Sequence, residues 1–410
     1  MKILLKNALI FDGVRDALIA DHMIGVENGR IAHFAREAWD QKPDREIDFR
    51  GRVILPGLID AHYHAYGGVD SWSEMEQLPI TYLAHKARNM LTASLDRGFT
   101  TVRDVAGADY GLWRAIEDGD FEGPRLFFGG KALSQTGGHG DPCARHREPC
   151  GCSRMPGILT QVVDGVEAVR VATREIMRRG AHHVKLMASG GLSSPTDPVW
   201  MVQYSADEIS AIVEEAARLK GYVCAHAYGA DAITRAVKLG VRSIEHGNLI
   251  DEETAQIIRA QNAFVVPTLV AYDDLPGNED EIGASTQEYG GLAAFQRRGM
   301  EAVDHCQKAG VTLGFGTDLF GTLCPYQMQE FRLRGEVQKP LDVLRSATSI
   351  NAALLKREGE IGCIREGALA DIIALDANPL ENLSALYGAP DAVRFVMKEG
   401  RIRRSALDAL

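Results

Sequence analysis

The sequence lacks a long apolar run, and this absence limits where the protein can reside. No stretch of it reaches the roughly 18 consecutive apolar residues that a membrane span requires. The opening residues, MKILLKNALIFDG, carry charges where a secretory signal peptide has its apolar core. The seven cysteines are an odd number in a chain of 410 residues, which is not a disulfide framework. We therefore expect a cytoplasmic protein with no membrane partner.

The chain also lacks an excess of basic residues. It has 45 lysines and arginines against 56 aspartates and glutamates, which gives a formal net charge of −11. Nucleic-acid-binding proteins usually carry a basic face, so we expect no nucleic-acid partner. The length suffices for one domain of barrel size and a second, smaller one. We expect a small-molecule substrate and a homo-oligomer whose subunit number the sequence does not give.

Both ends of the chain are rich in short strands. Near the N-terminus, Asn28-Gly29 separates two apolar runs and is typical of a tight hairpin turn. Near the C-terminus, residues 367–375 and 393–397 form two more apolar runs. These ends flank a middle of different character. The pattern predicts a small β-sandwich domain built from residues 1–56 and 360–410.

The middle of the chain alternates strands with helices. Residues 162–179 have apolar positions at helical spacing and are followed by Gly180. A second helix is expected over residues 205–220, where Ser205 and Glu208 form a capping-box pattern. Counting from the strand before His62 gives eight strands in about 260 residues, which is the pattern of a (β/α)8 barrel of about 250 residues. We therefore predict an α/β fold with a (β/α)8 TIM barrel over residues 57–359.

Metal-type side chains stand at the ends of these predicted strands. His62 and His64 alternate along one strand, so both imidazoles project to the same side, where they can begin a divalent metal site. Four further residues follow other strands: Lys185, His226, His246 and Asp318. Any one of them alone is more often structural. Because a barrel brings the C-terminal ends of its strands to one rim, the five strands together predict a metal site there.

This set of residues resembles the amidohydrolase superfamily, in the branch that binds two bridged divalent metals. The resemblance implies that carbon dioxide carboxylates Lys185 and that the resulting carbamate bridges two ions, for which zinc is our first choice. A hydroxide between the ions would be the nucleophile, and Asp318 would pass its proton to the leaving group. The resemblance divides the other ligands into His62, His64 and Asp318 for one ion and His226 and His246 for the other.

Lys185 carries the most information about the branch. A lysine in an apolar run usually reaches for solvent, but inside a barrel an unpaired ammonium is costly to bury. A carbamate would offer two oxygens where the ammonium offers no lone pair. The flanks of the chain also resemble imidazolonepropionase. That enzyme and the related deaminases use one metal and lack this lysine, so Lys185 speaks against a mononuclear deaminase.

Two further residues resemble the substrate-facing groups of metal-dependent dipeptidases in this superfamily. His139 lies in the glycine-rich run Ser134–Asp141, and Tyr228 follows the strand that ends at His226. The resemblance implies that His139 and Tyr228 contact the scissile carbonyl, although Tyr228 could equally be a packing aromatic. Cleavage of Xaa-Pro dipeptides is our first choice. The alternatives are Xaa-Arg or Xaa-Lys dipeptides, N-acyl amino acids, a mononuclear deaminase and a non-catalytic homologue.

Several features leave alternatives open. The group that binds the substrate's carboxylate is unassigned among Arg103, Arg145, Arg147 and the backbone amides of Gly190 and Gly191. Residues 195–201 and 272–289 are expected to be long loops that shape the pocket. The segment 143–152 holds three cysteines and a histidine, which could bind a structural zinc or be an irregular loop with ordinary thiols.

Overall fold

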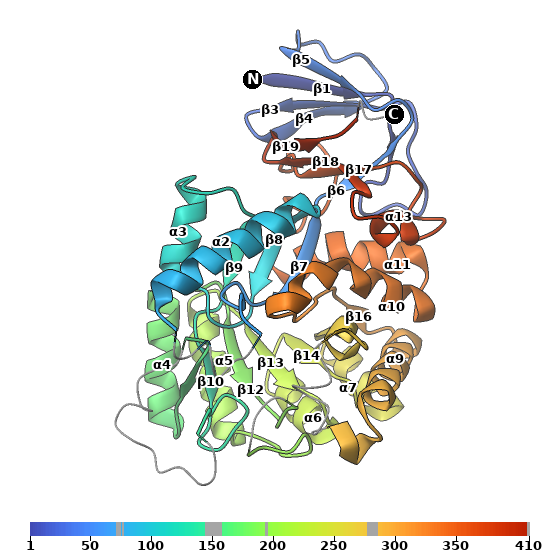
Figure 1. The fold of residues 1–410 in the computed structure, drawn as a ribbon. Helices are drawn as coiled ribbons and strands as arrows, with labels where there is room; N and C mark the ends of the chain where they lie inside the picture. The colour runs from blue at the N-terminus through green and yellow to red at the C-terminus, as the bar shows by residue number, and fades with distance from the viewer. Residues whose placement is uncertain (71–74, 76–77, 144–157, 193–195, 277–285, 408–410) are drawn as a thin grey trace.

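The computed structural model describes the chain from residue 1 to 407, except residues 71–74, 76–77, 144–157, 193–195 and 277–285. A β-rich module that holds both termini sits against a larger body of parallel strands and helices (Figure 1). No helix in the described part of the chain is long and apolar enough to cross a membrane. The predicted segment 143–152 and the arginines at 145 and 147 lie outside the described residues, apart from Cys143.

Two sheets make up the β-rich module. Four strands pair in the order β4-β3-β1-β5: Arg30–Ala35, Met23–Glu27, Lys2–Lys6 and Arg45–Asp48. Five strands pair in the order β19-β18-β17-β6-β2: Arg401–Ser405, Val393–Lys398, Ile372–Leu375, Val53–Pro56 and Leu9–Ile10. Glu27 pairs with Arg30 across Asn28-Gly29, which confirms the predicted hairpin.

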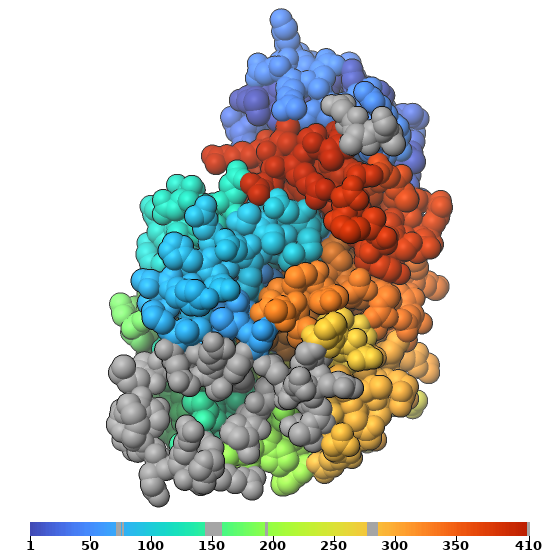
Figure 2. All heavy atoms as spheres, viewed as in Figure 1, coloured from blue at the N-terminus to red at the C-terminus, as the bar shows by residue number. Residues whose placement is uncertain are grey.

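One hydrophobic core joins the two ends of the chain in this module. Ile3, Leu5 and Ile24 from the N-terminal strands pack in the same buried cluster as Ile372 and Phe395 from the C-terminal strands. In the space-filling view, the C-terminal residues (red) lie directly against the N-terminal residues (blue) (Figure 2). Apolar side chains of both ends are thus buried together, while the division into domains at residues 56 and 360 stays a prediction.

The larger body is built on parallel strands. Three of them pair in the order β7-β8-β9: Leu58–Tyr63, Phe99–Asp104 and Arg125–Phe128. Seven pair in the order β11-β10-β12-β13-β14-β15-β16: Thr160–Val162, Ala132–Ser134, Val184–Met187, Val223–Ala227, Ser243–His246, Phe264–Val266 and Thr312–Leu313. Hydrogen bonds from Ala61 N to Phe315 O (2.8 Å) and from Asp318 N to His62 O (2.9 Å) connect the two sheets. The α/β fold with parallel strands is confirmed, and closure into one barrel stays a prediction.

Helices lie outside these strands (Figure 1) and bury their apolar faces against them. Those that follow the first strands are α2 (Ile80–Asp96), α3 (Tyr110–Glu117), α4 (Val166–Arg178), α5 (Ala206–Arg218), α6 (Ala230–Lys238) and α7 (Glu252–Ala260). The later ones are α9 (Leu292–Ala309), α10 (Gln329–Val337), α11 (Pro340–Arg345), α12 (Asn351–Leu354) and α13 (Ser384–Tyr387). Short helical turns are η1 (Leu269–Tyr272), η2 (Gln287–Tyr289), η3 (Gly321–Met328) and η4 (Ser346–Ile350).

Two predicted elements differ from the structure in their limits. The helix expected from residue 162 begins at Val166, because Val162 belongs to strand β11 and Gly165 turns the chain with a φ of 90°. The strand expected over residues 312–318 is regular only at Thr312–Leu313. Beyond it, a Cβ on Gly316 would lie 2.6 Å from the Cβ of His62, so this segment packs too closely for side chains at its glycines. The capping box of α5 is confirmed, since Ser205 Oγ accepts from Glu208 N.

Candidate metal-binding active site

The candidate metal ligands and the two candidate donors predicted from the sequence line one cavity of about 120 Å³. The six predicted metal ligands in its wall are His62, His64, Lys185, His226, His246 and Asp318. The two predicted donors, His139 and Tyr228, line it as well. Most of these residues lie near or beyond the C-terminal ends of their strands, which explains how positions far apart in the sequence meet. Lys185 is the second residue of β12, and its long side chain reaches the cavity from within the strand.

Asp318 lies at the centre of the histidines. Its Oδ1 is 3.3 Å from His62 Nε2 and 3.1 Å from His64 Nε2, and its Oδ2 is 3.7 Å from His246 Nδ1. Potential ligand atoms of His62, His246 and Asp318 all lie within 4.8 Å of one another, so these three could hold a divalent ion. The resemblance implies that His246 binds an ion together with His226. In the structure the His246 ring lies close to His226 and also close to His62 and Asp318, which the resemblance assigns to the other ion.

Each of the four histidines uses one ring nitrogen in a hydrogen bond, which orients the ring and leaves the other nitrogen for a ligand. The contacts are His62 Nδ1 to Glu245 Oε2 (2.9 Å), His64 Nδ1 to Ala106 O (3.0 Å), His226 Nε2 to Gly190 O (3.1 Å) and His246 Nδ1 to Thr268 Oγ1 (2.9 Å). Burial lowers the pKa of His226 and of His246 well below the ordinary 6.5, so both imidazoles are neutral, as metal ligands must be.

Lys185 fits the proposed metal site only if its charge is changed. Its side chain is 2% exposed, and its ammonium donates no hydrogen bond to any residue that the structure describes. Burial lowers the pKa of this ammonium below the ordinary 10.5. A lysine with a lowered pKa is more readily the neutral amine that reacts with carbon dioxide. The donor set fits a divalent metal ion, and a carboxylated Lys185 would add oxygen ligands to it.

His139 and Tyr228 stand over the histidine cluster. The His139 ring stacks on the His226 ring with their centroids 4.0 Å apart, and His139 Nδ1 is 3.3 Å from Asp197 Oδ2. The Tyr228 ring stacks on His246 at 5.3 Å. Burial raises the pKa of Tyr228 above the ordinary 10.0, so its hydroxyl remains protonated and able to donate. Both side chains could donate a hydrogen bond to an oxygen in the cavity.

The backbone is left-handed at two candidate ligands, His246 and Asp318, and at Thr268, whose hydroxyl contacts His246. The φ angles are 72° at His246, 46° at Thr268 and 56° at Asp318, although none of these residues is glycine. Such conformations are uncommon for residues with a Cβ, and they cluster at functional sites where surrounding contacts hold them. Here they turn the chain sharply after successive strands, and of the three residues His246 and Asp318 line the cavity.

Three of the carboxylate-binding groups considered from the sequence lie in the described part of the structure, and each of them donates hydrogen bonds within the protein. Arg103 does not line the cavity, because its guanidinium is buried and donates to Glu245, Ser243 and Ala61. The amide of Gly190 donates to Met201 O, and that of Gly191 donates to Asp197 Oδ2. Both backbone amides therefore hold the loop, and the group that binds a substrate carboxylate stays unassigned.

The sequence analysis missed three residues that contact the site. Glu245 accepts from His62, Asp197 lies against His139, and Tyr272 pairs its hydroxyl with that of Tyr228 at 2.7 Å. A glutamate in the apolar strand before His246 is the signal that could have revealed Glu245, since a buried carboxylate needs a partner. No comparable signal marks Tyr272 or Asp197, which lie in stretches without strand or helix periodicity.

Comparison with known proteins identifies the family of the chain. A sequence profile of the amidohydrolase family matches residues 53–403. The chain belongs to the amidohydrolase family and is a hydrolase.

Three known proteins are similar to this chain over most of its length. A solved prolidase complexed with N-methylphosphonate-L-proline has 42% sequence identity and a TM-score of 0.93, with 99% of this chain and all of that chain covered. Ochratoxinase from Aspergillus niger is 35% identical over 369 residues, which are 85% of this chain and 75% of that protein. Imidazolonepropionase from Streptomyces avermitilis is 26% identical over 418 residues, 94% of this chain and 87% of that protein.

Proposed function

We propose that this protein is a binuclear metal-dependent hydrolase that cleaves the peptide bond of dipeptides with a C-terminal proline. The observation that carries the proposal is the meeting of all six candidate ligands and both candidate donors on one cavity. The similarity to a solved prolidase supports the choice of substrate. Asp318, His139 and Tyr228 are proposed as the catalytic residues.

The two proposed ions, when bound, would polarise the scissile carbonyl and lower the pKa of a water molecule. They would be held by His62, His64, His226, His246, Asp318 and carboxylated Lys185, and we propose zinc first. Asp318 would accept a proton from the attacking water and deliver it to the leaving nitrogen. His139 and Tyr228 would donate hydrogen bonds to the carbonyl oxygen as negative charge develops on it.

The cavity wall favours an apolar leaving residue over a basic one. Apolar side chains in the wall include Leu159, Met187, Leu192, Phe320 and Leu323. Among the described residues that line it, Asp318 is the only carboxylate, and its oxygens face the histidines. Among the described residues of the wall, an arginine or lysine of the substrate would therefore find no free carboxylate, whereas a proline ring would bury apolar surface.

Hydrolysis of N-acyl amino acids is the second candidate. It would use the same residues on an amide bond, and the 35% identity to an ochratoxinase supports it. The apolar wall accommodates an apolar amino acid in either reaction, so the wall alone does not separate the two.

The proposal includes the closure of the barrel and the division of the chain into two domains. We propose that the two parallel sheets are parts of one (β/α)8 barrel over residues 57–359, and that residues 1–56 and 360–410 form a β-sandwich domain. The hydrogen bonds between Ala61 and Phe315 and between Asp318 and His62 support the first part. The shared core of the two termini supports the second. Cytoplasmic location and a homo-oligomer remain predictions.

The deciding experiment is hydrolysis of a dipeptide library by the zinc-loaded protein, scored by the C-terminal amino acid released. Release of proline from many Xaa-Pro pairs is the expected result, and an Asp318→Asn variant should release none. Release of arginine or lysine would keep the chemistry and overturn the specificity. If no dipeptide is cleaved but N-acyl amino acids or ochratoxin are, the second candidate replaces the first.

A further inference from the structure

We propose that Glu245, held in place by Arg103, is a positioning residue that sets the orientation of His62 and thereby the affinity of the metal ion that His62 binds. This inference rests on the proposed binuclear metal centre. It concerns metal binding and not peptide cleavage, so it can be tested separately from the substrate.

The first contact is between Glu245 and the candidate ligand. Glu245 Oε2 lies 2.9 Å from His62 Nδ1, and the two side chains are 0% and 1% exposed. A carboxylate can only accept a hydrogen bond, so the proton of the neutral imidazole must reside on Nδ1. The lone pair is then on Nε2, which lies 3.3 Å from Asp318 Oδ1 on the cavity side. The contact fixes both the tautomer and the direction of the ring.

The second contact fixes Glu245 itself. Arg103 Nη2 donates to both carboxylate oxygens of Glu245, at 2.8 and 2.9 Å. Arg103 Nη1 donates to Ser243 Oγ at 3.0 Å, and that hydroxyl donates to Glu245 Oε1 at 2.7 Å. Besides its contact with His62, the carboxylate thus accepts three hydrogen bonds from two donor groups, Arg103 Nη2 and Ser243 Oγ, which leaves it little freedom to rotate.

Arg103 also holds the backbone of the ligand strand. Its Nε donates at 2.5 Å to the carbonyl of Ala61, the residue before His62. Arg103 comes from β8, Glu245 from β14 and His62 from β7, so the group connects strands of both parallel sheets. One fully buried guanidinium therefore positions His62 twice, through its backbone and through its ring.

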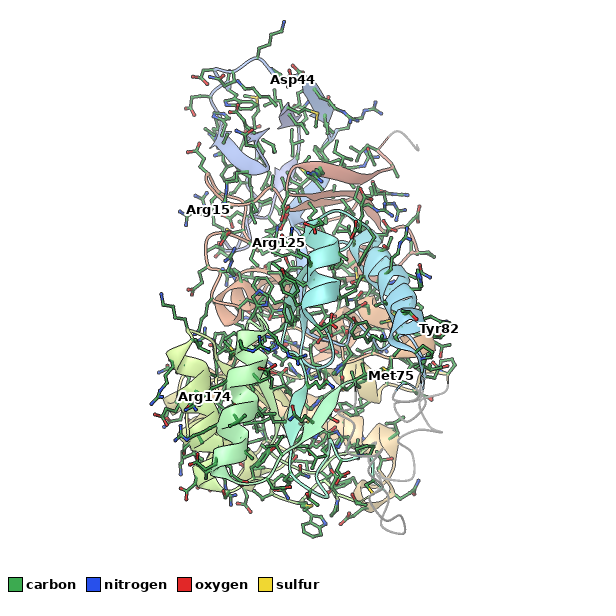
Figure 3. All side chains as sticks on the ribbon, turned by 90° about the vertical axis from the view of Figure 1, so that its left-hand side faces the viewer. Arg15, Asp44, Met75, Tyr82, Arg125 and Arg174 are labelled. Carbon is green, nitrogen blue, oxygen red and sulfur yellow. The ribbon has the colours of Figure 1, made fainter. Side chains whose placement is uncertain are left out.

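Stability alone does not account for this ion pair. A buried pair of charges gives about as much stability as apolar side chains of the same volume, because the charges lose their hydration. Arg103 and Glu245 nevertheless occupy the interior directly beneath a candidate ligand. A second buried pair offers a comparison: Arg125 donates to Asp371 at 2.7 Å where the parallel strands meet the β-rich module. Figure 3 places Arg125 at that junction, and neither residue lines the cavity.

Glu245→Gln is the test variant, and Asp371→Asn is its matched control. Metal-free protein would be titrated with zinc against a chromogenic chelator to obtain the affinity of each ion. We expect Glu245→Gln to weaken one ion by roughly 10–100-fold and to leave the other unchanged, as the loss of a partner of a ligating histidine does. Asp371→Asn should leave both affinities unchanged, even if its melting temperature falls as far. Wild-type affinity for both ions in Glu245→Gln would overturn the proposal.

A second variant keeps the test decisive if Glu245→Gln does not fold. Arg103→Lys retains the charge, but a single ammonium cannot reach Glu245, Ala61 and Ser243 together as the three guanidinium nitrogens do. It should weaken the same single ion and change the visible spectrum of the cobalt-loaded protein. Equal weakening of both ions by this variant, or of neither, would contradict the assignment to His62. Normal metal binding without cleavage of any dipeptide would refute the proposed function and leave this inference intact.

Discussion

The hydroxyl groups of Tyr228 and Tyr272 lie 2.7 Å apart, and each of these side chains is only 3% exposed. A hydroxyl has a single proton to donate, so only one member of the pair can donate to the other. If Tyr228 donates to a substrate oxygen, it must accept from Tyr272. Hydrogen bonds in such a chain strengthen one another, so Tyr272 would make Tyr228 a better donor.

This hydrogen bond predicts that Tyr228→Phe lowers kcat more than Tyr272→Phe does. Tyr228→Phe should lower kcat by roughly 10²–10³-fold, as the loss of one donor to a developing oxyanion does. Tyr272→Phe should lower kcat by up to about tenfold, which corresponds to one net hydrogen bond of about 1 kcal/mol. Steady-state kinetics with an Xaa-Pro dipeptide measure both. Tyr289→Phe, in a half-buried ring that packs on Phe295 at 5.4 Å, is the control and should retain the wild-type rate. A larger loss in Tyr272→Phe than in Tyr228→Phe would reverse the proposed roles.

Gly191 should not tolerate a side chain. A Cβ at this position would lie 2.0 Å from His139 Cε1 and 2.2 Å from His139 Nδ1. Gly191→Ala is therefore expected to displace the His139 ring and to lower kcat by at least about tenfold, because a misplaced donor stabilises the transition state less. Gly229→Ala is a suitable control, since no atom lies within 4 Å of its added Cβ and its φ of −91° suits any residue. Equal activity of the two variants would refute this placement of His139.

Lys185→Ala should lose most metal binding. The variant removes the only group proposed to bridge the two ions, and elemental analysis of the purified protein would show less than one ion per chain in place of two. An exposed lysine, Lys308, which pairs with Asp304 at 2.6 Å, supplies the control variant Lys308→Ala with full metal content. Retention of two ions and full activity by Lys185→Ala would make the binuclear scheme wrong.

Removal and restoration of the metal should depend on carbon dioxide. Prolonged chelation is expected to abolish activity and to lower the melting temperature, because the ions stabilise only the folded state. Reloading with zinc should restore activity faster with added bicarbonate than in buffer depleted of carbon dioxide. Recovery at the same rate in both buffers would speak against a carbamate on Lys185.

Glu330 predicts a dependence of stability on pH that is separate from the metal. Burial raises its pKa from the ordinary 4.5 to about 7, against the attraction of Arg334. Between these values the folded protein holds a proton that the unfolded chain has lost, so the free energy of unfolding falls as the pH rises from about 4.5 to about 7. The loss is on the order of 3 kcal/mol, and Glu330→Gln should not show it. Denaturant melts of the metal-free proteins across this range would measure the difference, and parallel curves would contradict it.

The candidate site could be read from the sequence to the extent that it follows from strand ends. His62, His246 and Asp318 each follow an apolar run, and a parallel α/β fold brings such positions to one edge whatever their separation along the chain. Lys185 was recognisable because a charged residue within an apolar strand needs an explanation. These are properties of short segments, and they are present before the chain folds.

The contacts that hold the candidate ligands in place leave no comparable pattern in the neighbouring sequence. Arg103 and Glu245 are 142 residues apart, and nothing near either one specifies the other as its partner. Arg103 could therefore be only one of several candidates for binding an anion. The same holds for the amide of Gly191, because its acceptor, Asp197, reaches it through a turn of the loop with no periodic pattern. Partnerships of this kind depend on the assembled fold, which short-range patterns do not describe.

The pairing of β6 with β17 has a consequence for biosynthesis. Residues 53–56 run directly into β7, which carries His62 and His64, and they pair antiparallel with residues 372–375. A ribosome must therefore make nine-tenths of the chain before the strand that leads into the first two ligands acquires this neighbour. Until then β6 has an open edge. The first candidate ligands to be synthesised are thus among the last to be fully supported, which would place completion of the proposed metal centre late in synthesis.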